Sequence, residues 1–372
     1  LGGKKGGDAL MALDIERRRR SEHYVRPLDI FEFTANAAFV PAVKFHIPSP
    51  AEVATQWENE MAQPNLLYGA PDVMPQVEVS RKIPGPSGVE YLLRFRSPSR
   101  FISSPAYARV YEPKRASANL PTLIHGSGLA SFYDQVTYWP EEDCLGRFLS
   151  GRGYRVILME SLYHGRRTVP GYYNSEPYFA TAPVGIFLSH AAQTQETAVL
   201  IHWARALGAS MVGVSGVCLS GVVAQQVASY CGTWPVSMRP DIVFLGATCN
   251  RLGQVLLNSE ESRFFGIAPA LRKAGWTEAE LEKLCGVLEP LPTPGLPPDR
   301  ILAVLGAWDT SMPYQFALEM LHNWKVPDQN IITWQVSHYG FVDSLFRKSG
   351  FQNLIMQAMD RTRIGCQNDK TG

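Results

Sequence analysis

The sequence predicts an α/β fold with a mostly parallel central sheet and helices on both faces. From about residue 120 onwards, short runs rich in Val, Ile and Leu alternate with longer helical patterns, and this alternation is typical of parallel strands joined by helices. Before residue 113, several strand-like runs follow one another with no helical pattern between them, which predicts an antiparallel meander. The third observation is a sharp, glycine-flanked junction of a strand and a helix at residues 216–221.

Apolar periodicity assigns the strands and helices of the main domain. We expect strands at residues 77–79, 90–95, 106–111, 120–124, 154–159, 210–217, 241–247, 300–305 and 331–336. We expect helices at residues 187–207, 219–230, 313–324 and 341–359, and the end of a helix at 144–152. Thr277 and Glu280 form a capping box, which predicts a further helix up to about Cys285.

The chain of 372 residues divides into three parts. Residues 1–26 form a basic tail that we expect to be mobile and solvated; a targeting remnant or a membrane-surface contact is the alternative for its four arginines at 17–20. Residues 27–75 form a helical extension, expected to pack on the main domain, with a membrane-interface helix as the alternative. Residues 76–365 form the main domain. An insertion at about 250–298 is expected to form a helical lid above the carboxyl edge of the sheet.

Composition excludes several classes of protein. Apolar residues make up 45% of the chain and the net charge is +1, so a sizeable core is expected and nucleic-acid binding has no electrostatic support. The six cysteines are scattered and form no C-x-x-C pair, so we expect no metal site and an intracellular location, in the cytoplasm or an organelle such as the mitochondrion. No apolar stretch reaches about 18 residues, so we expect no membrane-spanning helix. We also expect no cofactor.

The junction at residues 216–221 has the pattern of a nucleophile elbow centred on Cys218. Small residues must stand two before and two after the nucleophile, because the turn is too tight for larger side chains. Gly216, Ser220 and Gly221 meet this demand. The helix that starts there favours a thiolate, because its N–H groups and dipole point at the sulfur. A buried core cysteine is the alternative interpretation.

Two serines close to Cys218 are rival centres for the same turn. An elbow at Ser215 would need a small residue at position 217, and an elbow at Ser220 would need one at position 222. Valine stands at both positions. Cys218 is therefore the better candidate.

An acid and a base follow the elbow in the chain order that this kind of site requires. Asp309 follows the strand at 300–305, and His338 follows the strand at 331–336. Taken singly, each could be a turn carboxylate or a surface histidine. Their joint order and positions predict a catalytic triad of Cys218, His338 and Asp309.

The oxyanion hole is expected to combine the backbone N–H of Leu219 with one from the loop at 125–128. Ser127 or Gly128 would supply this second donor. His125 in the same loop is more consistent with an anchoring role than with a catalytic one.

A polar stretch at 160–167 follows another strand and lies at the same edge of the sheet. Glu160 is an alternative acid for the triad. We favour an internal ion pair of Glu160 with Arg166 or Arg167. The alternative is that one of these arginines binds a carboxylate or phosphate of the substrate.

These motifs together resemble the α/β-hydrolase domain-containing protein 18 family, over residues 27 to 360. The matching segments are Leu28-Asp29-Ile30, Phe95-Arg96-Ser97-Pro98, His125-Gly126-Ser127-Gly128, Leu158-Met159-Glu160, Tyr163-His164-Gly165-Arg166, and His338 with Phe346-Arg347. The resemblance implies an α/β-hydrolase fold and an intracellular serine hydrolase that acts on acyl esters, lipids included. The chain departs from the family at Cys218, where the family has serine, and at Ser220, where it has glycine. Cysteine elbows resemble those of dienelactone hydrolases and polyhydroxyalkanoate synthases.

The sequence thus predicts an acyl hydrolase that acts on an ester, lactone or thioester through a thioester on Cys218. An acyltransferase or synthase with the same triad is one alternative, and a non-catalytic hydrolase-fold subunit of a larger assembly is another. The expected partner is a small-molecule or lipid acyl substrate, with peripheral membrane contact as an alternative. The sequence predicts neither the substrate nor the oligomeric state.

Overall fold

The computed structural model describes residues 43–115, 119–129, 144–347 and 350–368 of the chain. The basic tail at 1–26 and the first part of the extension, including Leu28-Asp29-Ile30, lie outside the described residues.

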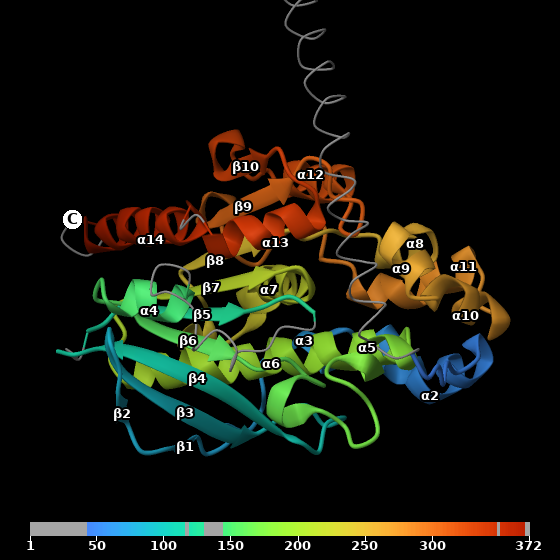
Figure 1. The fold of residues 1–372 in the computed structure, drawn as a ribbon, viewed down its shortest axis with the longest axis horizontal. Coiled ribbons are helices and arrows are strands. Elements are labelled where there is room, and N and C mark those ends of the chain that lie inside the picture. Colours follow the sequence, from blue (N-terminus) through green and yellow to red (C-terminus); the bar gives the residue numbers. More distant parts are fainter. Residues whose placement is uncertain (1–42, 116–118, 130–143, 348–349, 369–372) are drawn as a thin grey trace, which may run out of the picture.

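A single mixed sheet organises the described part of the chain. Its ten strands run in the order β1-β3-β4-β6-β5-β7-β8-β9-β10, with β2 paired to β3, and Figure 1 shows them stacked from β1 at the bottom to β10 at the top. The strands are β1 (Glu78–Val79), β2 (Ile83–Pro84), β3 (Gly88–Arg96), β4 (Pro105–Pro113), β5 (Thr122–Gly126), β6 (Arg155–Met159), β7 (Val212–Val217), β8 (Ile242–Gly246), β9 (Ile301–Gly306) and β10 (Ile331–Trp334). Strands β1 to β4 pair antiparallel, as do β4 and β6, whereas β6, β5, β7, β8, β9 and β10 pair in parallel. The predicted meander and parallel sheet are confirmed.

Helices cover both faces of this sheet. They are α2 (Pro50–Ala62), α3 (Asn65–Tyr68), α4 (Leu145–Ser150), α5 (Glu176–Ala180), α6 (Val184–Ala206), α7 (Leu219–Tyr230), α8 (Leu252–Asn258), α9 (Glu260–Phe264), α10 (Ile267–Lys273), α11 (Glu278–Cys285), α12 (Tyr314–Asn323), α13 (His338–Arg347) and α14 (Gly350–Asn368). No helix among the described residues combines the length and the apolar character needed to cross a membrane.

The sheet separates two apolar cores, because alternate residues of a strand point to opposite faces. In β9, Ile301, Ala303 and Leu305 pack in the core that contains α6, α7 and α12. Leu302 and Val304 pack in the other core, with α4 and α14. Strand β9 is therefore apolar throughout, as is typical of a parallel strand covered on both sides.

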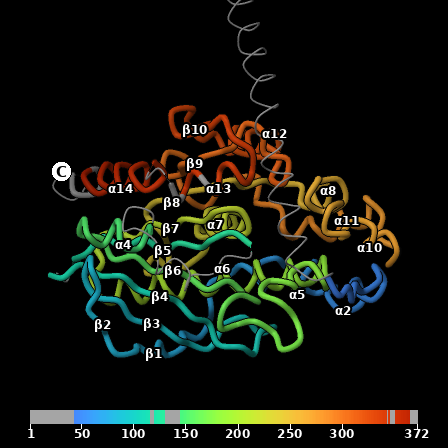
Figure 2. The backbone as a smooth tube through the Cα atoms, in the orientation of Figure 1, coloured from blue at the N-terminus to red at the C-terminus, as the bar shows by residue number. Residues whose placement is uncertain are grey.

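The insertion between β8 and β9 forms the four short helices α8 to α11. The predicted capping box is present, since Thr277 and Glu280 exchange hydrogen bonds at the start of α11. These helices lie beside α2 at one end of the molecule (Figure 2), and Trp276 donates a hydrogen bond from Nε1 to the carbonyl of Pro48 at 2.8 Å. The insertion and the described part of the extension therefore support each other.

The contacts of helix α2 with the main domain include a buried tryptophan. The ring of Trp57 lies 5.0 Å from the ring of Phe101 and 5.2 Å from that of Phe187, measured between centroids. Trp57 is 7% exposed. Aromatic contacts of this kind are expected if the extension packs on the main domain.

The predicted closing helix at 341–359 is wrong in its extent. The structure has two helices in its place, α13 and α14, and α13 begins at His338 itself. The second helix, α14, begins at Gly350, a poor helix former whose effect an apolar periodicity does not reveal. Strand β5 also begins two residues later than predicted, at Thr122, because Pro121 has no N–H to donate to the ladder.

Candidate active site

Cys218 lies between β7 and α7, at the carboxyl edge of the parallel strands. Its φ of 55° and ψ of −118° are strained for a residue that has a side chain. Its N–H donates to the carbonyl of Gly246 at 3.0 Å, and its carbonyl accepts from the N–H of Val222 at 3.2 Å. A strained residue tied in this way to the neighbouring strand and to the following helix has the geometry of a nucleophile elbow.

Two glycines make this turn sterically possible. A Cβ atom on Gly216 would lie 1.7 Å from the carbonyl oxygen of Ser220, and one on Gly221 would lie 2.6 Å from that of Gly246. Both distances are far below van der Waals contact, so no larger residue fits without moving the backbone. The glycines are thus required by the turn around Cys218.

His338 and Asp309 come together at the same edge of the sheet. Asp309 follows β9 and His338 follows β10, and the two side chains are hydrogen-bonded at 2.7 Å between Nδ1 and Oδ2. The other carboxylate oxygen of Asp309 accepts from the N–H groups of Ser311 at 3.0 Å and Met312 at 2.7 Å. His338 and Asp309 are 4% and 5% exposed, so water scarcely competes for this bond.

The pKa of His338 reflects burial on one side and two neighbouring side chains on the other. Burial alone lowers it, because a low-dielectric surrounding disfavours the imidazolium. The charge of Asp309 and the side chain of Cys218 act in the opposite sense and raise the pKa of His338 well above its usual 6.5. The structure therefore brings the three residues of the predicted triad together around one imidazole.

The loop that follows β5 lies against the elbow. The Oγ of Ser220 donates to the carbonyl of Ser127 at 2.7 Å, and a Cβ atom on Gly128 would lie 3.2 Å from the Cβ of Cys218. Leu219 begins α7 directly after Cys218. Of the predicted oxyanion donors, Leu219 and Gly128 therefore lie beside Cys218, and Ser127 is bonded to the first turn of α7.

His125 is a buried residue of β5. Its Nδ1 lies 3.1 Å from the Oγ of Ser215 on the adjacent strand β7, and burial lowers the pKa of His125 to about 4. A neutral histidine bonded across two strands is consistent with anchoring the loop rather than with proton transfer.

The polar stretch after β6 is occupied by ion pairs. Glu160 pairs with Arg166 and accepts the backbone N–H of Arg166 at 3.0 Å. Arg167 instead makes a two-bond ion pair with Glu196 on α6, at 2.8 and 2.9 Å. Asp309, and not Glu160, holds the hydrogen bond to His338. The sequence pattern missed Glu196, because nothing local shows which helix faces Arg167.

A cavity of about 50 Å³ opens beside Cys218. Its wall is mainly apolar. Tyr178 on α5 and Ile186 on α6 form one part of the wall, and the insertion contributes another part through Leu252, Leu256 and Ile267. The insertion that the sequence predicted as a lid thus contributes directly to the space around the thiol.

Glu261 on α9 also lines this cavity and is a site residue that sequence reasoning missed. The pKa of the Glu261 carboxyl is raised, mainly by burial and also by the charge of Asp309. The charge of His338 and a hydrogen bond with Ser311 act in the opposite direction. The sequence signal for Glu261 is an acidic residue at the start of a helix in the insertion. Glu260, directly before it, gives the same signal, so the sequence does not distinguish the two residues. Among the described residues, no cluster of His, Cys, Asp and Glu could hold a metal ion.

Comparison with known proteins finds similar chains among solved structures. A solved acetyl xylan esterase from a Paenibacillus species superposes with a TM-score of 0.50 at 14% identity, covering 86% of this chain and 97% of that one. A cell-wall-degrading esterase from Xanthomonas oryzae gives 0.49 at 12% identity, covering 81% and 96% of the two chains. A Pyrococcus horikoshii acylaminoacyl peptidase gives 0.49 at 13% identity, covering 78% of this chain and 42% of that one. No protein-family model and no curated protein sequence matches the chain.

The strand order, the elbow at the carboxyl edge and the first of these superpositions define the architecture. The chain has the α/β-hydrolase fold, with a mixed, mostly parallel sheet flanked by helices.

Proposed function

We propose that the protein is an acyl hydrolase in which Cys218 is the nucleophile, His338 the base and Asp309 the residue that orients the base. The observation that carries this proposal is the convergence of a strained cysteine elbow and a buried His338–Asp309 pair at 2.7 Å on the same edge of the sheet. The resemblance to a family of acyl ester hydrolases supports it. Cysteine in place of serine makes the covalent intermediate a thioester.

The first half-reaction is acylation of the thiol. With Asp309 on Nδ1, the remaining nitrogen of His338, Nε2, takes the proton of Cys218 as the sulfur attacks the acyl carbon. The oxyanion that forms is stabilised by the backbone N–H of Leu219 and by one from the loop at 127–128. When the carbon–oxygen or carbon–sulfur bond to the leaving group breaks, His338 returns the proton to that group.

The second half-reaction releases the acyl group. His338 takes a proton from water, and the hydroxide formed attacks the thioester carbon. The sulfur of Cys218 leaves and accepts the proton back from His338, while the carboxylic acid product loses its own proton to solvent. Asp309 keeps the imidazole oriented through both steps and stabilises its charged form.

The size of the cavity beside the thiol supports a substrate with a short acyl group. A volume of about 50 Å³ holds roughly three water-sized groups, which is the size of an acetyl or propionyl chain. Its apolar wall suits the hydrocarbon part of the acyl group. We therefore infer that esters or thioesters of short-chain acids are the preferred substrates, rather than long-chain lipids.

Glu261 adds a constraint on the charge of the substrate. Its carboxyl group lines an otherwise mainly apolar cavity, where a carboxylate of the substrate would be poorly solvated and, once Glu261 is ionised, repelled. We infer that Glu261 discriminates against acyl groups that carry a carboxylate.

Steady-state hydrolysis of p-nitrophenyl acetate, butyrate and octanoate tests the proposal. We expect kcat/KM to fall as the chain lengthens, and Cys218→Ala to abolish turnover of all three esters. The matched control is Cys231→Ala, because Cys231 is equally a buried cysteine but lies at the far end of α7, in the short helix at 231–233. Full activity in the Cys218→Ala variant, or equal loss in Cys231→Ala, would refute the assignment.

An acceptor experiment separates hydrolysis from acyl transfer. The protein is incubated with the acetate ester in the presence of increasing concentrations of a primary amine. A hydrolase releases acetate at a rate that the amine leaves unchanged. If acetylated amine replaces acetate as the main product at millimolar amine, transfer is the reaction.

A further inference from the structure

Glu261 is the acidic residue in the wall of the cavity beside Cys218. It lies on α9, one of the helices of the insertion. No lysine, arginine or histidine is found among the described residues that line this cavity. The wall therefore holds a carboxyl group and no cationic side chain, and a carboxylate in mainly apolar surroundings is most stable when it is paired with a positive charge.

The groups that act on Glu261 from within the protein compensate its charge only in part. The charge of His338 lowers the pKa of the Glu261 carboxyl, whereas the charge of Asp309 raises it. These two charges belong to one hydrogen-bonded pair, so their effects oppose each other. A hydrogen bond with Ser311 also lowers the pKa, but burial outweighs it and the pKa remains raised. A cation supplied by a ligand would complete the compensation.

Three other hydroxyl groups of the cavity wall are bonded to the protein. The oxygen of Ser259 accepts the N–H of Ser262 at 3.1 Å, and the hydroxyl of Ser262 donates to a backbone carbonyl of α8. The hydroxyl of Tyr178 lies 3.1 Å from Nε2 of His190. Glu261 is therefore the group in the wall that is best suited to bind a polar part of the substrate.

Two aromatic rings line the same cavity. Tyr178 and Phe179 come from α5, which lies next to α9 (Figure 1), and their ring centroids are 5.1 Å apart. Burial raises the pKa of the Tyr178 hydroxyl well above 10, and the charges of Cys218 and Glu261 add to this, so Tyr178 lies within electrostatic range of both. Aromatic rings attract cations, and rings beside a carboxylate suit an ammonium group.

We propose that the substrate is an aminoacyl ester or thioester whose ammonium donates hydrogen bonds to the carboxylate of Glu261 while Cys218 attacks its acyl carbon. This inference rests on the proposed function of Cys218 and names its substrate class. The ammonium lowers the pKa of the carboxyl, so the ligand itself favours the ionised form of Glu261. A cavity of about 50 Å³ suits a short aminoacyl group, because an ammonium is close in size to the methyl group of propionyl.

Matched pairs of ethyl esters test the proposal. Glycine and propionate esters differ only in an ammonium against a methyl group, and β-alanine and butyrate esters differ in the same way with one more carbon. Ethanol release at pH 7, where amino groups are mostly protonated, gives kcat/KM for each ester. We expect wild type to prefer the amino ester by at least about tenfold in one pair or both, because a charge-assisted hydrogen bond forms.

Variants of the two neighbouring glutamates identify the group responsible. Glu261→Gln should abolish the preference, and Glu261→Asp, which keeps the charge, should retain part of it. Glu260→Gln is the matched control, because Glu260 is the exposed neighbour on the same helix, and its ratio should stay within about twofold of wild type. The ratio within a pair is compared, so a general loss of activity does not imitate the result.

The pH dependence gives a second readout. Any preference within the glycine pair should decline between about pH 7 and pH 9, because the amine loses its charge there while propionate is unaffected. The proposal is overturned if Glu261→Gln keeps the preference or if Glu260→Gln abolishes it as well. If wild type hydrolyses propionate and butyrate esters but prefers neither amino ester, this inference fails and the proposed function stands. If wild type hydrolyses none of the esters, both fail.

Discussion

Asp309 is fixed from two sides. Its Oδ2 is hydrogen-bonded to His338 at 2.7 Å, while its Oδ1 accepts two backbone N–H groups of the loop at 309–312. The loop therefore sets the angle of the carboxylate, and the carboxylate sets the orientation of the imidazole. In this way the end of β9 determines which nitrogen of His338 is left for Cys218.

The first prediction concerns Asp309→Asn. An amide keeps the shape of the side chain but cannot stabilise an imidazolium, so we expect kcat for acetate ester hydrolysis to fall by about ten-thousandfold, the scale seen when other triads lose their acid. KM should change little. Asp328→Asn is the control, because the Asp328 side chain is 96% exposed. A loss of less than about tenfold in Asp309→Asn would argue against an orienting role.

The second prediction concerns the pH dependence of stability. The pKa of His338 is raised in the folded protein above 6.5, so its imidazolium stabilises the fold fully below about pH 6.5 and this contribution is lost as the pH rises through the raised pKa. The free energy of unfolding of wild type minus that of His338→Gln should therefore shrink as the pH rises above about 6.5. Urea unfolding of both proteins measures it. A difference that stays constant or grows would show that the pKa is not raised.

The third prediction concerns the elbow glycine. Gly216→Ala places a methyl group 1.7 Å from the carbonyl oxygen of Ser220, so we expect it to lower the free energy of unfolding by at least about 3 kcal/mol. Gly286→Ala is the control, since no atom lies within 4 Å of the added methyl group, and its effect should stay within about 1 kcal/mol. Equal stabilities of the two variants in urea would mean that the turn tolerates a side chain.

The elbow could be predicted from sequence because its constraints are local. A strand, a helix and the small residues at 216, 220 and 221 all lie within one short stretch, and only the placement at Cys218 satisfies the turn. Asp309 and His338 could be predicted because parallel strands bring their carboxyl ends to one edge. The order of these residues along the chain, together with the parallel sheet, therefore predicts which of them lie close together.

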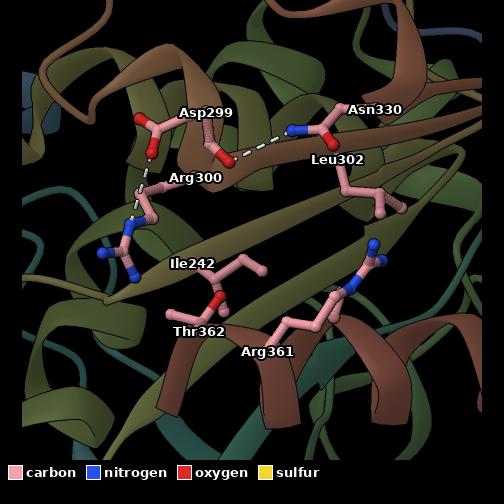
Figure 3. Close-up of a pocket in the computed structure, with 8 residues that line it drawn as sticks. Ile242, Asp299, Arg300, Leu302, Asn330, Arg361 and Thr362 are labelled. Carbon is pink, nitrogen blue, oxygen red and sulfur yellow. Dashed lines mark hydrogen bonds and ion pairs between the residues drawn. The ribbon is translucent and has the colours of Figure 1, made fainter. Parts of the chain in front are cut away.

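Contacts between distant segments could not be predicted in this way. Glu196 pairs with Arg167 and Glu261 reaches the cavity of Cys218 because of how α6 and α9 are rotated and packed, and periodicity does not specify the partner of a buried polar side chain. The division into α13 and α14 was missed for a related reason, since the apolar pattern continues from one helix to the other. The cavity of about 280 Å³ that Leu302 and Arg361 line joins the start of β9 to α14, which are far apart in sequence (Figure 3).

The fourth prediction concerns the buried ion pair. The side chains of Arg167 and Glu196 are both 0% exposed, so Glu196→Gln leaves a charge without its partner in the interior and should lower the free energy of unfolding by about 3–5 kcal/mol. Glu319→Gln is the matched control, because it breaks an exposed pair with Arg251 and should cost less than about 1 kcal/mol. Chemical denaturation compares them, and similar losses would mean that burial of the Arg167–Glu196 pair has little energetic effect.

The fifth prediction concerns the charge preference of the cavity. In wild type, kcat/KM should be higher for a neutral acetyl ester than for the succinyl monoester. At a pH at which Glu261 is ionised, Glu261→Gln should narrow that ratio by roughly tenfold, because it removes a charge that repels a carboxylate. Glu260→Gln, its exposed neighbour on α9, should leave the ratio unchanged. A ratio unaffected by Glu261→Gln would exclude this residue from charge selection.

Trapping the covalent intermediate tests the central claim most directly. The protein is mixed briefly with p-nitrophenyl acetate, quenched in acid and digested, and the peptides are analysed by mass spectrometry. We predict an acetyl group on Cys218 that neutral hydroxylamine removes, as it does with thioesters. In the His338→Ala variant, this acetyl group should no longer form at neutral pH. Acetylation of Ser220 or Ser215 in place of Cys218, or active turnover by a protein whose Cys218 never carries the acetyl group, would contradict the account.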